Sequence, residues 1–425
     1  MLLMPRNLRA ALLHGEYMKA DASYRFAPLD VPYLRLLQGN WDQVRLQLAG
    51  DNVTKFDVFD GLHFSHKKFE RVLVKEGLDA AWPRTLKSGT RCLDKETWET
   101  MTGLNPDLEA LHQLYKTLKM PRLNIACDPD GRNRILLGAF GAITSRNTPG
   151  SDSRGTFIFA PAKWARFLIK PPEGRAVAYI DWSCQEYGIG AILSGDQNML
   201  RSYEAGDPYM EFSILAGAVP AGATKSSHPA DRKLYKSATL AIVYGQTVWG
   251  FCQKTRVSKP VAERVFRDYR RLYHRFLSWR EKQVDSFGIS LHLSTKLGWT
   301  LHRGARVKPN TVLNFTAQAT GAEMLRLAVI EMMRRGVQVC CPIHDAVLIE
   351  APVNEIDSAV AEARGSMDAA SALLLDGYKL RNEVDVFRFP ERFFDKDGAE
   401  TWRKVSAIAE MLRPPKALAE TGGSQ

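Results

Sequence analysis

The amino-acid sequence predicts a mixed α+β fold, and three observations lead to this class. Residues 175–183 (RAVAYIDWS) form an apolar, β-branched run that ends on an acid, which is typical of a buried strand. Residues 337–351 (VQVCCPIHDAVLIEA) contain two further apolar runs around a tight His-Asp turn. Helical patterns dominate residues 185–290 and 311–335, which lie between these strand segments.

Weaker patterns fill the rest of the chain. Pro83 and Gly89 interrupt a helical stretch whose last helix is expected at 107–119 (DLEALHQLYKTLK). No internal repeat is visible. The remaining expectations are short apolar pieces broken by turns at 1–40, helices at 40–120, loops at 130–160, a hairpin at 294–307 and a disordered tail at 413–425.

The composition is that of an ordinary globular chain rather than a membrane or disulfide-bonded protein. Its 425 residues are 45% hydrophobic and 25% charged, which at about 150 residues per domain predicts two to three subdomains. No run of 18 apolar residues occurs, and the N-terminal MLLMPRNLRAALLHG lacks the uninterrupted apolar stretch of a signal peptide. Six cysteines are scattered without a CxxC pair, so neither a zinc ribbon nor a disulfide framework fits. We therefore expect a cytoplasmic protein in a reducing compartment.

The positive charge is concentrated in one stretch. The formal net charge is +11, and residues 225–282 alone carry 14 Lys or Arg against 4 Asp or Glu, a local net of +10. Large aromatic residues are interleaved with these cations. One interpretation is a solvated helical hairpin with a buried aromatic side, and the other is a surface that meets the phosphates of a nucleic acid. Both can hold, and a nucleic acid is the expected partner.

Asp181 and Asp345 are the first candidate site. Each is flanked by apolar residues of a β run, so each carboxylate should lie beside a sheet at the edge of a core. One acid at a strand end is often only a helix cap. Two such acids, with a basic helix between them in sequence, match the rigid oxygen ligands that a two-metal phosphoryl-transfer site requires.

The helix expected at 228–245 is the second candidate. Arg232, Lys236, Leu240 and Tyr244 recur every four residues and therefore share one face. Cations in the first turns of a helix are repelled by the positive end of its macrodipole. Their presence there favours the interpretation that this helix end binds an anion, such as a triphosphate. An ordinary surface helix is the alternative.

The helix expected at 311–335 holds the third candidate. Asn314 and Gln318 lie four residues apart on an otherwise apolar helix. Buried amides are usually satisfied core groups. Pointing outward, both amides would reach the acceptors that recur in the minor groove of every base pair.

Three motifs in a fixed order resemble those of family A (polymerase I-like) DNA polymerases. DWSCQEYGIGAILSGD (181–196) resembles motif A, typically DYSQIELR, and RKLYKSATLAIVYG (232–245) resembles motif B, RxxxKxxxFxxxYG. IHDAVLIE (343–350) resembles motif C with its HDE. The resemblance covers roughly residues 130–390, and residues 64–120 are similar to the family's thumb.

This resemblance implies a right-hand polymerase fold with an antiparallel palm sheet, helical fingers and a helical thumb. No acidic exonuclease constellation precedes the thumb, so proofreading and 5′ nuclease domains are expected to be missing. The implied divisions are an N-terminal remnant at 1–35, a thumb at 36–130, a palm at 131–195 and 301–412, fingers at 196–300, and the tail at 413–425.

The resemblance also assigns roles to individual residues. Asp181 and Asp345 are implied as the metal-binding catalytic carboxylates, with the Trp182 backbone carbonyl as a further ligand, and Lys236 as the catalytic proton donor to the leaving pyrophosphate. Glu186 is the implied steric gate under the sugar, and in the family this carboxylate bonds the motif B tyrosine. The implied deoxynucleotide-binding residues are Arg232, Lys236, Leu240, Tyr244, Glu186 and Tyr209. The implied primer–template residues are His344, Asn314, Gln318 and Arg146.

The chain departs from the family pattern at a few positions. Motif C's usual Glu is Ala346, so a third carboxylate is missing, and motif B's usual Phe is Leu240. The histidine expected after motif A aligns with Tyr209. The TGR loop before motif A aligns with FGA (140–142), which leaves Arg146 as its substitute.

The expected activity is template-directed addition of deoxynucleotides to a primer 3′ end, using two Mg²⁺ ions for which Mn²⁺ is an alternative. The expected partners are primer–template DNA, deoxynucleoside triphosphates and separate exonuclease or replication factors, with a monomeric protein and no membrane. Two alternatives stay open. One is a single-subunit RNA polymerase-like enzyme, against which the Glu186 gate argues, and the other is a catalytically impaired primer–template-binding module, suggested by Ala346 and Leu240.

Overall fold

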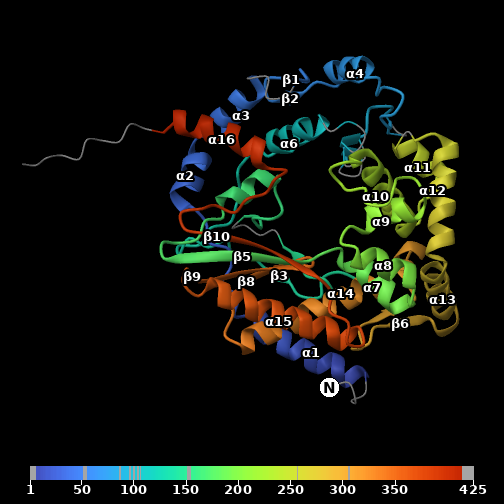
Figure 1. Cartoon of the computed structure of the whole chain (residues 1–425). Coiled ribbons are helices and arrows are strands. Elements are labelled where there is room, and N and C mark those ends of the chain that lie inside the picture. Colours follow the sequence, from blue (N-terminus) through green and yellow to red (C-terminus); the bar gives the residue numbers. More distant parts are fainter. Residues whose placement is uncertain are drawn as a thin grey trace, which may run out of the picture. The chain divides into compact units, whose positions relative to one another are not determined.

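The chain folds into two compact units, each assembled from several segments (Figure 1). Unit 1 comprises Met1–Ala27, Leu136–Gly150 and Pro171–Pro390, and unit 2 comprises Pro28–Ile135, Ser151–Lys170 and Glu391–Gln425. Of the expected tail at 413–425, all but Arg413 lies outside the described residues. The computed structural model describes residues 6–50, 55–85, 88–94, 97–98, 101–102, 105, 107–150, 155–255, 257–304 and 307–413.

A four-stranded antiparallel sheet lies at the centre of unit 1. Its strand order is β10 (Asn382–Arg388), β5 (Arg175–Trp182), β9 (Ala346–Pro352) and β8 (Gln338–Ile343). β5 and β9 consist mainly of Ala, Val, Ile and Leu, which pack well on a buried pleated surface. The α+β class and the strands expected from the three apolar runs are confirmed. β10 is an additional strand that the sequence analysis does not predict.

Helices cover one face of this sheet, as Figure 1 shows. α15 (Ile356–Leu374) packs on β5 and β9, and α14 (Pro309–Arg334) packs on β8 and on α15. α14 is apolar around most of its circumference because it has neighbours on several sides. It confirms the helix expected at 311–335.

The N-terminal region differs from the expectation of short pieces broken by turns at 1–40. It contains α1 (Arg6–Asp21), which packs on α14, and α2 (Val31–Gly39) in unit 2. Buried Leu13, Tyr17 and Ala20 of α1 are spaced by four and three residues, which is a helical period. The stretch between the two helices contains the turn that the sequence indicates.

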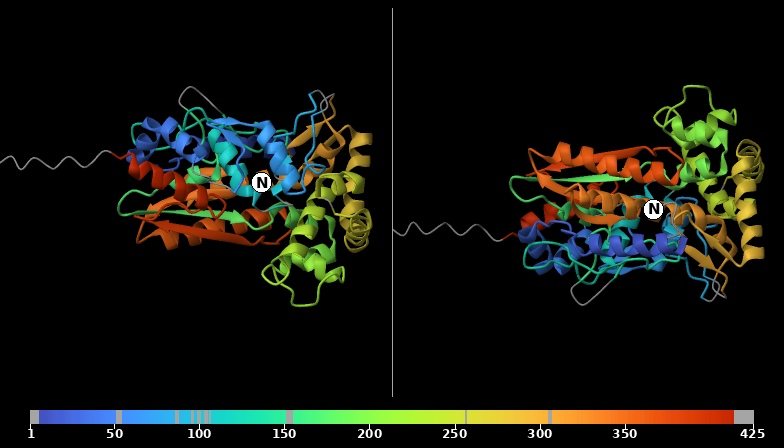
Figure 2. Two further views of the ribbon diagram at one scale, coloured as in Figure 1. Left: turned by 90° about the horizontal axis from the view of Figure 1, so that it is seen from above. Right: turned by 90° about the horizontal axis from the view of Figure 1, so that it is seen from below.

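A run of helices follows β5 in unit 1 and lies beyond one end of the sheet (Figure 2). Aromatic side chains fill its interior, with Phe212 in edge contact with Tyr235 and Tyr269. The helical expectation for 185–290 is therefore confirmed. The helices are α7 (Gln185–Ser194), α8 (Gln197–Glu204), α9 (Pro208–Leu215), α10 (Pro229–Val243), α11 (Val248–Thr255), α12 (Lys259–Leu272) and α13 (His274–Ser290).

Two short hairpins complete unit 1. β6 (His292–Ser294) pairs with β7 (Thr300–His302), which confirms the hairpin expected at 294–307. β3 (Leu137–Gly138) pairs with β4 (Thr148–Pro149) within the segment expected as loops. No helix in the described part of the chain is long and apolar enough to cross a membrane.

Unit 2 has a core of stacked indole rings. Trp164 lies 5.8 Å from Trp41 and 6.4 Å from Trp402 between ring centroids, and its Nε1 donates to Thr117 Oγ1 at 2.9 Å. The helix expected at 107–119 is confirmed. Besides α2, the elements are α3 (Trp41–Gly50), β1 (Phe59–Asp60), β2 (His63–Phe64), α4 (His66–Lys75), α6 (Leu108–Leu118), the 3-10 helix η1 (Lys163–Leu168) and α16 (Ala399–Met411).

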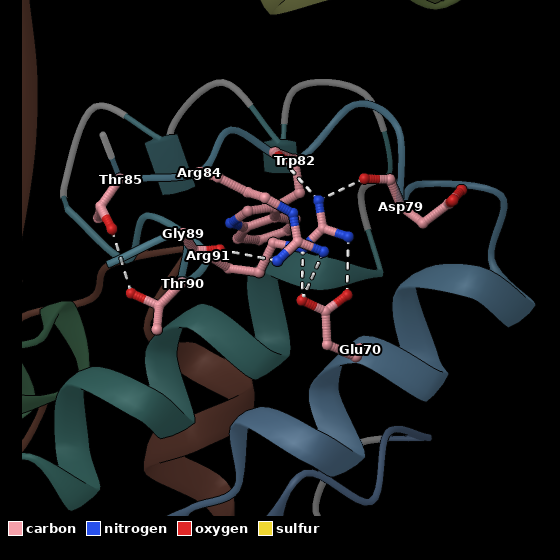
Figure 3. Close-up of polar contacts among 8 residues, drawn as sticks. All are labelled: Glu70, Asp79, Trp82, Arg84, Thr85, Gly89, Thr90 and Arg91. Carbon is pink, nitrogen blue, oxygen red and sulfur yellow. Dashed lines mark hydrogen bonds and ion pairs between the residues drawn. The ribbon is translucent and has the colours of Figure 1, made fainter. Parts of the chain in front are cut away.

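A buried guanidinium fixes the loop that follows α4 in unit 2 (Figure 3). Arg91 donates two parallel hydrogen bonds to the Glu70 carboxylate, at 2.9 and 2.7 Å, and a third to the Trp82 carbonyl at 2.8 Å. Arg84 reaches the same carboxylate at 3.0 Å and the Gly89 carbonyl at 2.8 Å. The two parallel hydrogen bonds between Arg91 and Glu70 fix the orientation of both side chains and attach the loop to α4.

Candidate active site

Strand pairing brings Asp181 and Asp345 together. The register partner of Asp181 on β9 is Ala346, and Asp345 directly precedes that residue. The Asp345 carbonyl accepts a hydrogen bond from the Trp182 N–H at 3.3 Å. Asp345 lies in the turn between β8 and β9 rather than on a strand, because His344 has a φ of 55° and reverses the chain there.

The environment raises the pKa of both carboxyl groups. The pKa of Asp181 rises to about 6, first through burial and then through repulsion from Asp345 and Glu383. Burial also raises the pKa of Asp345, and the nearby Arg146 cation partly opposes that rise. Two adjacent carboxylates that repel each other favour a bound cation, and Mg²⁺ is commonly held by one or two carboxylates together with substrate phosphates.

These residues therefore fit a magnesium site with two carboxylates. Among the described residues, no group of three or more His, Cys, Asp and Glu side chains could hold a metal ion. Ala346 is fully buried beside Asp181, at the position where motif C carries its further acid. The motif C acid that is missing from the sequence is therefore replaced in the structure by a buried alanine opposite Asp181.

Two cations of α10 lie over one aromatic ring. Arg232 and Lys236 are one turn apart, and their charged groups are 5.8 and 5.6 Å from the centroid of the Tyr209 ring. Arg232 also forms an ion pair with Asp207, the N-cap of α9. Tyr209 is half-buried, and burial raises the pKa of its hydroxyl, so it stays neutral beside the cations. Cation–π contacts of this kind hold the two side chains at one place on the helix.

The same face of α10 continues with two exposed apolar side chains. Leu240 is 39% exposed and Tyr244 is 44% exposed, so the shared face expected from the four-residue spacing is confirmed. The Tyr244 carbonyl accepts from Asn310 Nδ2 at 2.9 Å, and Gly245 then turns the chain with a φ of 73°. A Cβ at Gly245 would lie 2.3 Å from Asn310 Oδ1, so a side chain there would break this contact. Leu240 and Tyr244 are therefore accessible to a ligand beside a fixed turn.

The first turn of α7, α10, α13 and α14 surround a cavity of about 200 Å³ in unit 1. Cys184, Gln185, Phe276 and Trp279 supply walls that the sequence analysis does not single out. The cavity brings together predicted residues of all three motifs. The predicted site residues that line it are Glu186, Tyr209, Leu240, Tyr244, Asn314 and Asp345.

The carboxylate of Glu186 has partners other than the expected one. Oε1 accepts from Arg146 Nη2 at 2.7 Å, and Oε2 accepts from Gln318 Nε2 at 3.4 Å. Within the described residues Tyr244 makes no hydrogen bond to Glu186, which corrects the expectation taken from the family. Arg146 follows Ser145, whose φ of 63° is the left-handed conformation that glycine adopts most readily. Residues 144–146 (TSR) are therefore a second candidate for the family's TGR beside FGA (140–142), and this alignment stays a prediction.

The remaining predicted residues are placed as follows in unit 1. The Asn314 amide is buried and engaged internally, accepting from Arg280 Nη2 at 3.1 Å and donating to the Asn310 carbonyl at 3.0 Å. His344 is exposed beside Asp345, and the Trp182 side chain is buried. The groove contacts of Asn314, Gln318 and His344 and the metal contact of the Trp182 carbonyl stay predictions.

Three neighbours of the site are missing from the sequence analysis. Arg280 is buried and bonds the last carbonyls of α10, at Ile242 and Val243, and no local pattern indicates this role. Glu383 lies opposite Asp181 on β10, and the alternation of acids with valines in NEVDV could have indicated that strand. Asp207 precedes a proline, which is a recognisable helix start.

Comparison with known proteins identifies the class to which this fold and site belong. The model of DNA polymerase family A matches residues 159–386, a span that contains the acidic pair, α10 and the Glu186 carboxylate. The chain belongs to DNA polymerase family A.

Individual curated relatives of the chain are named as DNA polymerases. The chain is 24% identical over 398 residues to the thermostable DNA polymerase I of Thermus aquaticus, covering 87% of this chain and 46% of that protein. It is 26% identical over 348 residues to the DNA polymerase of Mycobacterium phage L5, covering 78% of this chain and 54% of the relative. The chain thus spans about half the length of these curated relatives.

A solved structure shows the same fold. The POL domain of Pol1 from M. smegmatis, in complex with DNA primer–template and dNTP, matches with a TM-score of 0.67 at 19% identity. The match covers 91% of this chain and 70% of that one.

Proposed function

We propose that this chain is a template-directed DNA polymerase that adds deoxynucleotides to the 3′ end of a primer. The observation that carries the proposal is the β5–β9 register, which sets Asp181 beside Asp345. Membership of DNA polymerase family A supports it, as does the likeness to a domain solved with DNA primer–template and dNTP.

The proposal includes the right-hand division of the chain. The four-stranded sheet supports a palm at 131–195 and 301–412, and the helical run after β5 supports fingers at 196–300. Residues 36–130 would form the thumb, with 1–35 as an N-terminal remnant. We further propose a monomer that acts in the cytoplasm, synthesises without 3′→5′ excision and works beside separate exonuclease or replication factors.

Asp181 and Asp345, with the Trp182 carbonyl, would hold two Mg²⁺ ions, or Mn²⁺ in their place. When bound, such ions lower the pKa of an attacking hydroxyl and neutralise charge on the leaving pyrophosphate. The environment raises the pKa of both carboxyl groups in the free protein, so cation binding should weaken as the pH falls and the carboxylates take up protons. The protein's part is therefore to hold two oxygen ligands rigidly at the end of a sheet.

The cationic face of α10 would bind the triphosphate. Arg232 and Lys236 are held over Tyr209, so their charges can neutralise an anion without a large loss of side-chain entropy. Lys236 is exposed and would donate a proton to the departing pyrophosphate. Leu240 and Tyr244 would contact the base and sugar next to the cavity. Glu186 would exclude a 2′-hydroxyl, which favours a deoxynucleotide over a ribonucleotide.

Primer extension tests the proposal directly. Purified protein with a matched primer–template, Mg²⁺ and dNTPs should extend the primer by one nucleotide per templating base, and it should leave a mismatched 3′ end intact. Extension with NTPs in preference to dNTPs would favour the RNA polymerase-like alternative. Excision of the mismatch would refute the part of the proposal that concerns proofreading.

Ala346 supports one further candidate function. A buried alanine replaces a carboxylate next to Asp181, so a chain that binds primer–template without synthesis is a specific alternative. Tight DNA binding with no extension in either Mg²⁺ or Mn²⁺ would favour this alternative.

A further inference from the structure

The carboxylate of Glu186 is fixed from two directions by side chains of unit 1. Arg146 donates to one oxygen at 2.7 Å and Gln318 to the other at 3.4 Å. The Arg146 and Glu186 side chains are 24% and 28% exposed, so their ion pair is largely shielded from water. A charge-assisted hydrogen bond of this kind is short, directional and stronger than a neutral one.

A buried arginine fixes the loop that presents Arg146. Arg326 of α14 is 2% exposed and donates to the Ser145 carbonyl at 2.7 Å and to Ser145 Oγ at 2.8 Å. The Arg146 carbonyl accepts from the Ala142 N–H at 3.1 Å, which closes a tight loop. The residue before Arg146 is therefore held by α14, and the Arg146 carbonyl is held by a hydrogen bond within the loop.

We propose that Arg146 is a specificity-determining residue that holds Glu186 in place as the sugar gate. The inference rests on the proposed function, because it assumes that a nucleotide sugar meets Glu186. Among the described residues Tyr244, the motif B tyrosine, does not bond the gate, and Arg146 and Gln318 supply the restraint instead. A ribonucleotide must displace a carboxylate that is held by a charge-assisted hydrogen bond from Arg146 on a fixed loop.

The same geometry explains why an arginine suits this position. Only Nη2 of Arg146 bonds Glu186, and the guanidinium carries further donors. The expected contact with a primer end can therefore use other donors of the same side chain. Arg146 would then link the primer terminus to the gate, and a lysine, with one point charge, would do so less well.

The test measures nucleotide binding under conditions in which no nucleotide can be added to the primer. A primer–template with a dideoxy-terminated primer is titrated with matched dNTP or NTP in Mg²⁺, and the two Kd values are read from a fluorescent base next to the primer end. Arg146→Ala should lower the preference for dNTP over NTP by about ten-fold, the value of one charge-assisted hydrogen bond. Arg146→Lys should recover part of that preference. Most of the change should appear as tighter NTP binding rather than weaker DNA binding.

Two further variants separate a gate from a general structural role. Tyr244→Phe should keep the dNTP/NTP ratio within about two-fold whatever its overall affinity, since its hydroxyl does not bond Glu186 in this structure. Ser145→Gly keeps the left-handed backbone and removes one acceptor of Arg326, so it should loosen the gate less than Arg146→Ala. Unfolding temperatures equal to that of the wild type would show that the variants are folded.

The outcomes are distinct. An unchanged ratio in folded Arg146→Ala overturns the inference, and so does a loss in Tyr244→Phe as large as in Arg146→Ala. Wild-type protein that binds dNTP and NTP equally also overturns it. Failure of the wild type to extend an ordinary primer refutes the proposed polymerase activity instead, while the binding ratios still decide the role of Arg146.

Discussion

Asp181 and Asp345 are the side chains on which the proposed chemistry depends, and neutral replacements test them. Asp181→Asn and Asp345→Asn should each lower the rate of single-nucleotide insertion by at least about 10³-fold, because an amide is a poor ligand for a hard cation and several kcal/mol of charge stabilisation are lost. Binding to duplex primer–template should change by less than about three-fold, since the cations proposed to neutralise phosphates lie elsewhere. Rapid-quench insertion and fluorescence anisotropy measure the two quantities.

Asp385→Asn is the matched control for these variants. Asp385 carries the same charge on the same sheet, opposite Tyr179 on β5, and it is exposed; its repulsion raises the pKa of Asp181 less than burial, Asp345 or Glu383 does. Its replacement should leave insertion within about three-fold of the wild type, because a screened charge on the surface contributes little. Insertion by either catalytic variant at more than a tenth of the wild-type rate would contradict the two-carboxylate assignment.

Asp21 gives a pH dependence that does not involve the proposed metal site. It is the last residue of α1, where the helix dipole disfavours an anion, and its Oδ1 is buried without a hydrogen-bond partner among the described residues. Burial raises its pKa from 3.8 to about 6. Between these values the folded protein binds more protons than the unfolded chain, so the free energy of unfolding falls as the pH rises through this window.

Asp21→Asn should therefore be more stable than the wild type above pH 6, and the difference should vanish below about pH 4. The shift corresponds to at most about 3 kcal/mol, and because the side chain is only half-buried we expect about 1 kcal/mol after screening. Urea unfolding at several pH values between 4 and 8 measures the difference. A constant difference across this range would show that the carboxylate does not titrate as proposed.

At the scale of elements, α10 offers a gain-of-function test. Leu240 is exposed on the face that carries Arg232 and Lys236, and the family has a phenylalanine at this position. Leu240→Phe should lower the KM for dNTP by about two- to ten-fold, because a ring packs on the base with about 0.5–1.5 kcal/mol beyond its area. Ile289→Phe, on an exposed position of α13, is the control and should leave KM unchanged. A rise in KM for Leu240→Phe would mean that this side chain does not face the nucleotide.

The elements that sequence alone predicts are those with strong periodicity. β5, β8 and β9 are apolar runs, and α14 is a long stretch with many apolar residues and no helix breaker in its second half. The repeated spacing of 232, 236, 240 and 244 is enough to place these side chains on one face of α10. β10 was missed because its alternating pattern is short and polar, although it brings Glu383 opposite Asp181. Motif order and spacing thus predict the acidic pair and the cationic helix but not the full wall of the site.

Pairings between distant residues have no such local pattern. Arg146 and Glu186 are 40 positions apart in the chain, and Arg280 and Asn314 are 34 apart. Each pair forms because the folded backbone brings two unrelated segments within hydrogen-bonding distance. Composition and spacing in either segment alone carry no information about the partner. The expected Glu186–Tyr244 bond is not made among the described residues, and neither segment indicates that Arg146 and Gln318 are the partners of Glu186 instead.

At the scale of the whole molecule, the charge distribution predicts how DNA binding responds to salt. Of the net charge of +11, the stretch 225–282 contributes +10. α12 within it buries Phe266 and Tyr269 and exposes its arginines, so the helix with a buried aromatic side is confirmed, while contact with phosphates stays a prediction. The two interpretations of this stretch are compatible, because they concern opposite faces of one helix.

If this stretch and the proposed thumb neutralise about five phosphates, log K for primer–template should fall with log[salt] at a slope of about −4 to −5. Combined replacement of Arg267, Arg270 and Arg271 by Gln should reduce the magnitude of the slope by about 2 to 3, since each lost contact removes about 0.9.

The control replaces three arginines of another region by Gln: Arg334 at the end of α14, Arg335 directly after it, and Arg364 of α15. Arg335 already pairs with Glu331 and Glu362. The control removes the same charge and should leave the slope within about 0.5. Anisotropy titrations from about 50 to 300 mM KCl give the slopes. Equal slopes for the two triple variants would mean that α12 faces solvent and that only the overall charge of the protein attracts DNA.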